Sequence, residues 1–357
     1  MVLSIDENVS KRINSLRFLL IVFVVFIHNN PTEVNFASGT EIYTIPVYIA
    51  KIRHLVSGII AAVAVPLFFF ISGFLLYAKE TTFMSVLKKK SRTILVPYII
   101  WNILVALFLF VAQSFSFTKP YFAQNIIRNF GLLDWIDVFV GKFTQLRKNQ
   151  YPLVYQFWFL RDLFILNLLF LGIKKLIDRF PFGTCILFFI LWIAGINIYL
   201  VSTAALFYFS LGYYVIKYQV SYKKIDAIKR DDILLVYLIT IVIELFLKEY
   251  VPIIHSINIV VGSIFFLKLT YYFIRNEKIY RTLAWLEKYA FFVYAIHGIL
   301  LAVLQKLSVQ IIPMHGGWIL LQYFSVTILG ILLFLTIGII VRKITPKIYA
   351  LLTGGRL

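Results

Sequence analysis

Two residues with chemically useful side chains frame the first long apolar stretch of the chain, RFLLIVFVVFIH, which runs from Arg17 to His28. On an α-helix this spacing is about 16 Å and returns both side chains to nearly the same face. A neutral imidazole can act as a general base, and an arginine can bind phosphate or carboxylate. The alternatives are structural: Arg17 as an anchor that reaches the headgroups, and His28 as a hydrogen-bonded interfacial histidine. We take the pair as the candidate catalytic site.

Three further apolar segments contain polar residues, which inside a membrane usually face a bundle interior or a water-filled cavity. Ser72 lies in PLFFFISGFLLY, Trp158 and Arg161 in QFWFLRDLF, and His297 in YAIHGILL. Ser72 and Gly73 form either a close packing site or the wall of a substrate tunnel. Arg161 binds an anionic group or pairs with another helix. His297 binds substrate or is a core histidine bonded to a backbone carbonyl.

Motifs for other chemistries are missing from the sequence. No two histidines are three or four residues apart, and no HExxH, Walker A, Rossmann glycine or G-x-S-x-G pattern occurs. The single cysteine, Cys185, cannot form an intrachain disulfide. We therefore expect no metal site and no bound cofactor.

The composition indicates that these residues are positioned inside a lipid bilayer. Of the 357 residues, 61% are hydrophobic and only 14% are charged, whereas soluble domains are about half apolar and a quarter charged. The net charge of +19 falls in short runs between apolar segments. Such a distribution follows the positive-inside rule and argues against nucleic acid as a partner.

Apolar segments of membrane-spanning length predict the elements that carry the candidate residues. The predicted spans are about 14–30, 55–78, 93–115, 154–172, 182–199, 201–217, 233–249, 255–274, 289–309 and 317–341. The fold class is therefore all-α, a polytopic membrane bundle of about ten transmembrane helices, with residues 1–357 as a single domain. Lysines and arginines concentrate in the segments that are inside when both termini are cytoplasmic.

Taken together, these segments resemble acyltransferase family 3, the bacterial membrane O-acyltransferases of surface polysaccharides and related glycans. The family motif of Arg or Lys, ten residues and His matches Arg17 to His28. The F-x-S-G-F, W-F-L and aromatic-x-x-His motifs match FFISGFLLY, WFLRDLF and FFVYAIH, in family order. The chain departs from the family at two places. Near Asn14 the family often has Asp or Gly, and at residues 288–290 it commonly has a Gly and a Ser before the late histidine motif.

The resemblance implies transfer of an acyl group, most commonly acetyl, from cytoplasmic acyl-CoA to a hydroxyl of an extracytoplasmic or lipid-linked glycan. It implies His28 as general base and Arg17 at the donor phosphates. Arg161, Ser72, Trp158 and His297 would bind substrate. A covalent acyl-histidine step stays open. The implied location is a bacterial inner membrane, and the oligomeric state stays open.

Two other classes of protein fit part of the sequence. A secondary transporter or flippase for a glycan or small solute would also have many spans and buried charges, although such folds often show an internal repeat, and none is found here. A structural membrane subunit would need no chemistry. Release of CoA from acyl-CoA separates the enzyme from both alternatives.

Overall fold

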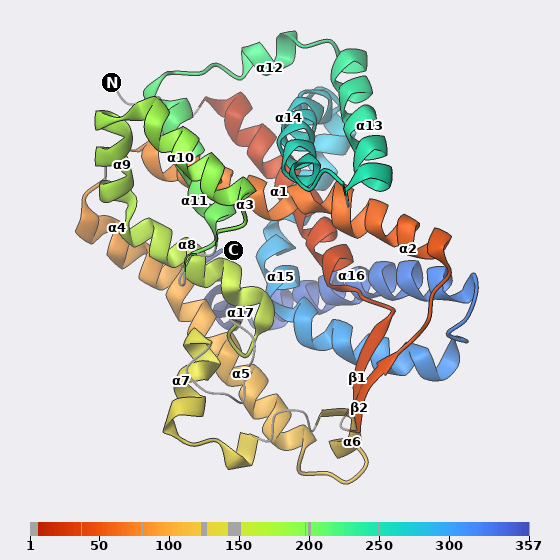
Figure 1. The fold of residues 1–357 in the computed structure, drawn as a ribbon. Helices are drawn as coiled ribbons and strands as arrows, with labels where there is room; N and C mark the ends of the chain where they lie inside the picture. Colours follow the sequence, from red (N-terminus) through yellow and green to blue (C-terminus); the bar gives the residue numbers. More distant parts are fainter. Residues whose placement is uncertain are drawn as a thin grey trace. The chain divides into compact units, whose positions relative to one another are not determined.

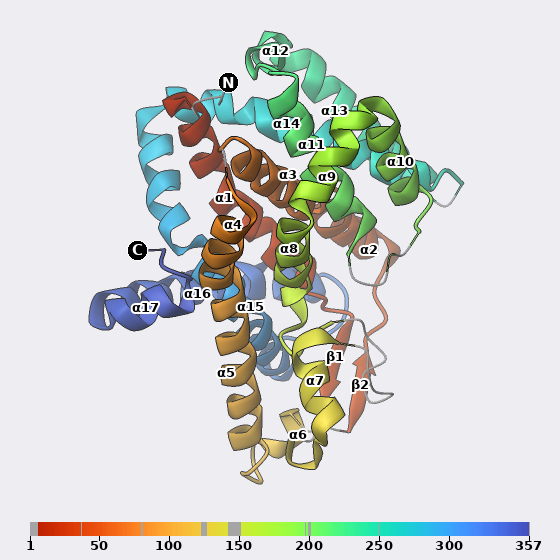
Figure 2. The same ribbon diagram turned by 90° about the vertical axis from the view of Figure 1, so that its left-hand side faces the viewer.

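The computed structural model describes residues 6–36, 38–79, 81–122, 127–141, 151–196, 198, 201–248 and 250–356. Most of these residues are helical, which confirms the predicted helical class (Figures 1 and 2). The described residues also include an antiparallel hairpin of β1 (Glu33–Phe36) and β2 (Gly39–Ile42), which the sequence analysis did not predict. In β1, Val34 is buried between the exposed Glu33 and Asn35, the alternation expected of a strand.

Ten membrane spans are not confirmed. Among the described residues, five helical segments are long and apolar enough to cross a membrane: Val47–Tyr77, Phe83–Ala112, Ile253–Arg275, Glu277–Ile311 and Trp318–Ile344. The pair Tyr155–Leu168 and Phe170–Arg179, bent by 61°, makes a sixth if it is one span.

The remaining predicted spans also coincide with helices, but with helices of a different kind. The segments 14–30 and 233–249 fall on α1 (Glu7–His28) and α13 (Arg230–Leu247), which are long but carry several charged residues. The segments 182–199 and 201–217 fall on α10 (Pro181–Ile193) and α11 (Thr203–Lys217), which are short. Hydropathy therefore located helices correctly, while their length and charge set them apart from the five long apolar segments.

The chain packs into two compact units. Unit one comprises residues 1–24, 53–90 and 162–290. Besides α10, α11 and α13, it contains η1 (His54–Ile60), η2 (Ala61–Val63), α3 (Ala64–Tyr77), α4 (Phe83–Lys90), α9 (Phe170–Arg179), α12 (Lys223–Ala227) and α14 (Ile253–Arg275).

Unit two comprises residues 25–52, 91–161 and 291–357. Besides the hairpin, it contains η3 (Ser91–Leu95), α5 (Val96–Ala112), α6 (Lys119–Phe122), η4 (Ile127–Asn129), α7 (Leu132–Val140), η5 (Tyr155–Phe157), α16 (Trp318–Ile344) and α17 (Pro346–Leu352). Four helices are divided between the units: α1, α2 (Val47–Arg53), α8 (Trp158–Leu168) and α15 (Glu277–Ile311).

In unit one, α3 and α11 cross at a pair of glycines. A Cβ added to Gly73 would lie 2.2 Å from the backbone oxygen of Phe209, and one added to Gly212 would lie 2.4 Å from the backbone nitrogen of Phe74. Only residues without a side chain allow the two backbones to come this close. Gly73 therefore has the packing role that was one of the two interpretations of this segment.

A buried carboxylate on α13 contacts two other elements of unit one. Glu244 of α13 is 1% exposed. Its Oε1 lies 2.7 Å from Nδ1 of His255 on α14 and 3.9 Å from Nε2 of His54 at the start of η1. An isolated buried carboxylate is costly, and these histidines supply it with polar partners.

Unit two has an aromatic core between α5, α15 and α17. The ring of Phe292 lies 5.8 Å from Trp101 and 5.5 Å from Tyr349, measured between ring centroids. The indole nitrogen of Trp101 also donates a hydrogen bond of 3.0 Å to the carbonyl of Leu352. The last short helix is thereby fixed against the helix that carries His297.

Candidate active site

Two histidines from distant parts of the sequence meet in unit two. The rings of His28, the last residue of α1, and His297, in the middle of α15, lie 5.2 Å apart between centroids. Tyr155 of η5 lies edge-on to His28 at 4.9 Å. His297 is fully buried and His28 is half-buried. The structure therefore brings together two residues that the sequence analysis had assigned separately, and we call them the histidine pair.

The hydrogen bond of His297 fixes which of its nitrogens carries the proton. Nδ1 lies 2.6 Å from the backbone carbonyl of Tyr294, so Nδ1 is the donor. Nε2 is then an acceptor, and among the described residues this buried atom has no hydrogen-bond partner. The interpretation of His297 as a core histidine explains Nδ1 but leaves Nε2 with an unused lone pair.

Asn29 positions the end of α1. It is 1% exposed, and its Nδ2 donates to the carbonyl of Tyr323 at 2.8 Å and to the hydroxyl of Thr327 at 2.9 Å. Its Oδ1 accepts a 2.9 Å bond from Nε2 of Gln305. The side chain directly after His28 is therefore bound to both α15 and α16, and holds the imidazole next to His297.

Gln156 belongs to the same site, although no role for it was predicted from the sequence. Its Nε2 donates to the backbone carbonyl of Ala295 at 3.2 Å, and the backbone carbonyl of Gln156 accepts a 2.7 Å bond from the hydroxyl of Tyr294. Gly298 leaves room for it, because a Cβ there would lie 2.2 Å from Oε1 of Gln156. The signal available in the sequence was an amide two residues before the WFL motif.

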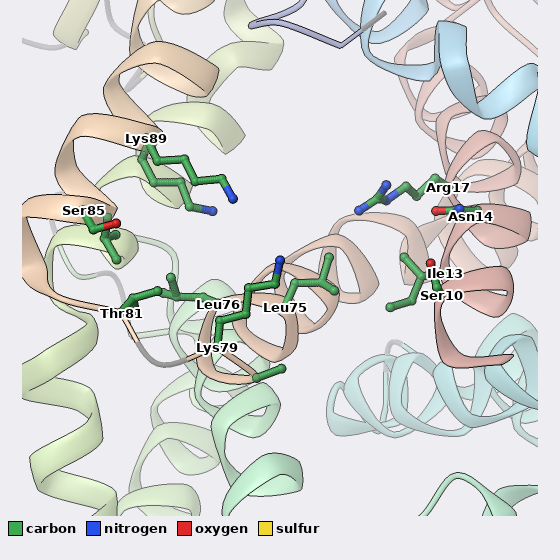
Figure 3. Close-up of a pocket in the computed structure, with 13 residues that line it drawn as sticks. Ser10, Ile13, Asn14, Arg17, Leu75, Leu76, Lys79, Thr81, Ser85 and Lys89 are labelled. Atoms are coloured by element: carbon green, nitrogen blue, oxygen red, sulfur yellow. The ribbon is translucent and has the colours of Figure 1, made fainter. Parts of the chain in front are cut away.

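A basic pocket of about 690 Å³ lies in unit one between α1, α3 and α4. Figure 3 shows Arg17 of α1 on one side, with Lys79 and Lys89 pointing toward it from the other sides. Lys90 also lines the pocket. Nη1 of Arg17 forms a 2.7 Å ion pair with Glu287, and the arginine side chain remains 31% exposed. The pocket has the charge expected of a site for a phosphorylated ligand.

Arg161, Trp158 and Ser72 are the other three candidate residues. Arg161 donates through Nη1 to the carbonyl of Val140 at 2.9 Å, which links α8 to the end of α7. Trp158 is half-buried at the first position of α8. Ser72 is half-buried on α3, one residue before the crossing glycine. Substrate binding by these three residues stays a prediction.

The chain is similar to known proteins over most of its length. The family model described as an acyltransferase domain matches residues 10–343. The chain is similar to the succinoglycan biosynthesis protein ExoH of Rhizobium meliloti (strain 1021), with 28% identity over 228 residues. The match covers 62% of this chain and 58% of that relative, less than two thirds of its length. No solved structure matches the chain. With all but its ends matched by the family model, the chain belongs to acyltransferase family 3.

Proposed function

We propose that the protein moves an acyl group, acetyl in the first instance, from cytoplasmic acyl-CoA to a hydroxyl of an extracytoplasmic or lipid-linked surface glycan. The observation that carries the proposal is that one helix, α1, bears both Arg17 of the basic pocket and His28 of the histidine pair. The similarity to a protein of succinoglycan biosynthesis supports a glycan as the acceptor. The membrane would be a bacterial inner membrane, with both termini cytoplasmic.

The donor binds by its phosphates in the basic pocket. Three residues provide positive charge: Arg17 on α1, Lys79 just after the end of α3, and Lys89 on α4. The guanidinium of Arg17 is oriented by Glu287 and uses Nη1 in that contact, which leaves further N–H groups for a phosphate. Arg17 and His28 are about 16 Å apart along α1. A pantetheine arm of similar length would carry the thioester from the phosphates to the histidine.

The acceptor reacts at the histidine pair. His28 takes the proton of the sugar hydroxyl as the oxygen attacks the thioester carbonyl. The bond between carbonyl carbon and sulfur then breaks, and the imidazolium returns the proton to the departing thiolate, so that free CoA and the glycan ester are formed. His297 accepts a hydrogen bond from the acceptor sugar through its unused Nε2. Transfer through an acyl-histidine would use the same two groups in two steps.

The test compares His28→Ala with His315→Ala, the same substitution at an exposed histidine between α15 and α16. Each purified protein is given acetyl-CoA or succinyl-CoA and a membrane glycan fraction. Free CoA and acylated glycan are both measured. Because a general base contributes about 10²–10⁴-fold, His28→Ala should lower both products by that factor, and His315→Ala should retain the wild-type rate.

Two results would contradict parts of the proposal. If His28→Ala and wild type release CoA at equal rates, the protein is an acyltransferase but His28 is not its general base. No CoA release by folded wild type with either donor, combined with uptake or movement of the glycan across vesicles, would favour the transporter or flippase.

A further inference from the structure

A second pocket, of about 340 Å³, lies in unit one. Neither the histidine pair nor the arginine and lysines of the basic pocket line it. It is formed by α1, α3, α11, α12 and α14, and its walls are mainly apolar, including Leu16, Phe70, Phe74, Ile216 and Leu267. The volume is within the range of small-molecule sites, which are apolar with few polar groups. Its composition is suited to a hydrocarbon chain.

One polar group in the wall of this pocket is incompletely bonded. Arg12 is 8% exposed, and its two terminal nitrogens bind the carboxylate of Asp226 at 3.0 and 2.5 Å. Its Nε is buried and has no acceptor in the part of the chain that the structure describes. Burying an N–H group without an acceptor costs free energy. Arg12 lines the pocket, so a bound ligand whose acceptor reaches Nε would recover that cost.

The charges around Arg12 restrict the kind of acceptor. Asp226 already neutralises the guanidinium, and Asp6 also lines the pocket, bonded to the hydroxyl of Tyr222 at 2.9 Å. A ligand carboxylate would add negative charge beside two carboxylates, which is unfavourable. A neutral carbonyl oxygen satisfies the single remaining N–H without that repulsion.

We propose that this pocket binds an acyl chain whose ester or thioester carbonyl accepts a hydrogen bond from Nε of Arg12. The hydrocarbon lies against the apolar walls. Ile225 of the short helix α12 lines the site, and α12 is held in place by the Arg12–Asp226 pair and by Lys268, whose Nζ donates to the backbone oxygen of Asp226 at 2.5 Å. Two molecules have this chemistry, a membrane glycerophospholipid and a long-chain acyl-CoA.

The experiment uses full-length protein in vesicles of ether-linked phosphatidylethanolamine and phosphatidylglycerol, so that the bulk lipid carries no ester carbonyl. One arm contains a phospholipid with a diazirine in its acyl chain, and the other an acyl-CoA with the same chain. After illumination, mass spectrometry locates the adducts. The variant Val220→Trp fills the pocket from an exposed lining position, and Val236→Trp is the matched control at an exposed position of α13 outside it.

We expect saturable adducts on pocket-lining peptides, lowered about tenfold by Val220→Trp because two groups cannot occupy one space, and unchanged by Val236→Trp. The arm that labels identifies the natural source of the chain. In wild type alone, an unlabelled ester phospholipid should compete about tenfold better than its ether-linked analogue. Equal competition would overturn the contact with Arg12. Unsaturable labelling spread over exposed helix faces, insensitive to Val220→Trp, would overturn the site.

Discussion

Replacing Asn29 with alanine tests how the histidine pair is held in place. The substitution removes three hydrogen bonds, to Tyr323, Thr327 and Gln305, from a side chain that is 1% exposed. It changes neither histidine and creates no charge. The effect therefore reports on the attachment of the end of α1 to α15 and α16.

The expected loss of stability depends on which hydrogen bonds the three partners keep in the Asn29→Ala variant. The carbonyl of Tyr323 also accepts a 2.8 Å bond from the hydroxyl of Thr327, so both groups keep a partner. Gln305 is half-buried and alone loses its acceptor. Interhelical hydrogen bonds in membrane proteins contribute about 0.6 kcal/mol each, so three bonds amount to about 2 kcal/mol. The larger penalty for orphaned buried groups in soluble proteins does not apply here.

The assay is equilibrium unfolding of purified protein in mixed micelles, with CoA release measured on the same samples. Asn29→Ala should lower the free energy of unfolding by about 2 kcal/mol and reduce CoA release, since His28 is no longer fixed beside His297. The control is Asn35→Ala in the exposed hairpin, where the side chain accepts a 2.6 Å bond from Thr40. That variant should change stability by less than about 0.5 kcal/mol. If the two variants unfold alike and release CoA alike, the proposed role of Asn29 is wrong.

Three other substitutions test the remaining features. Lys89→Glu in the basic pocket should raise the KM for acyl-CoA about tenfold at low salt, and less at high salt, because exposed charges are screened; steady-state kinetics at two ionic strengths measure this. Glu244→Gln keeps the shape of the buried carboxylate but removes the charge that faces its two histidines, and should lower the free energy of unfolding by about 1–3 kcal/mol. Gly298→Ala should displace Gln156 and lower CoA release, whereas Gly172→Ala, where nothing lies within 4 Å of the added Cβ, should not.

The sequence predicted helices well and the hairpin not at all. Long apolar runs such as Trp318–Ile344 are helical over their whole length because a bilayer leaves no other way to satisfy the backbone. The hairpin strands have only four residues each, and EVNF and GTEI carry too little hydrophobic alternation to be recognised. The charged residues of α1 and α13 and the short length of α10 and α11 set these four helices apart from the five long apolar segments.

Only some residues of the candidate site were singled out from the sequence, and their assembly was not predicted. His28 and His297 were both identified as polar residues in apolar segments, yet nothing in their spacing indicated that their rings would meet. Lys79 and Lys89 were interpreted only as topology signals, since exposed lysines near span ends usually are. Their convergence on Arg17 depends on how α1, α3 and α4 pack, and is visible only in three dimensions.

The crossing of α3 and α11 has a genetic consequence. A Cβ on Gly73 or Gly212 would collide with backbone atoms of the other helix, whereas one on Gly262 would meet side-chain atoms of Val63 and Tyr237. A collision with a side chain can be relieved by shortening that side chain, but the backbone cannot be shortened. Second-site suppressors should therefore arise for substitutions at Gly262 and be absent for those at Gly73 and Gly212. In a selection for activity, the helix crossing would therefore be recognised by two glycine positions whose substitutions no second mutation restores.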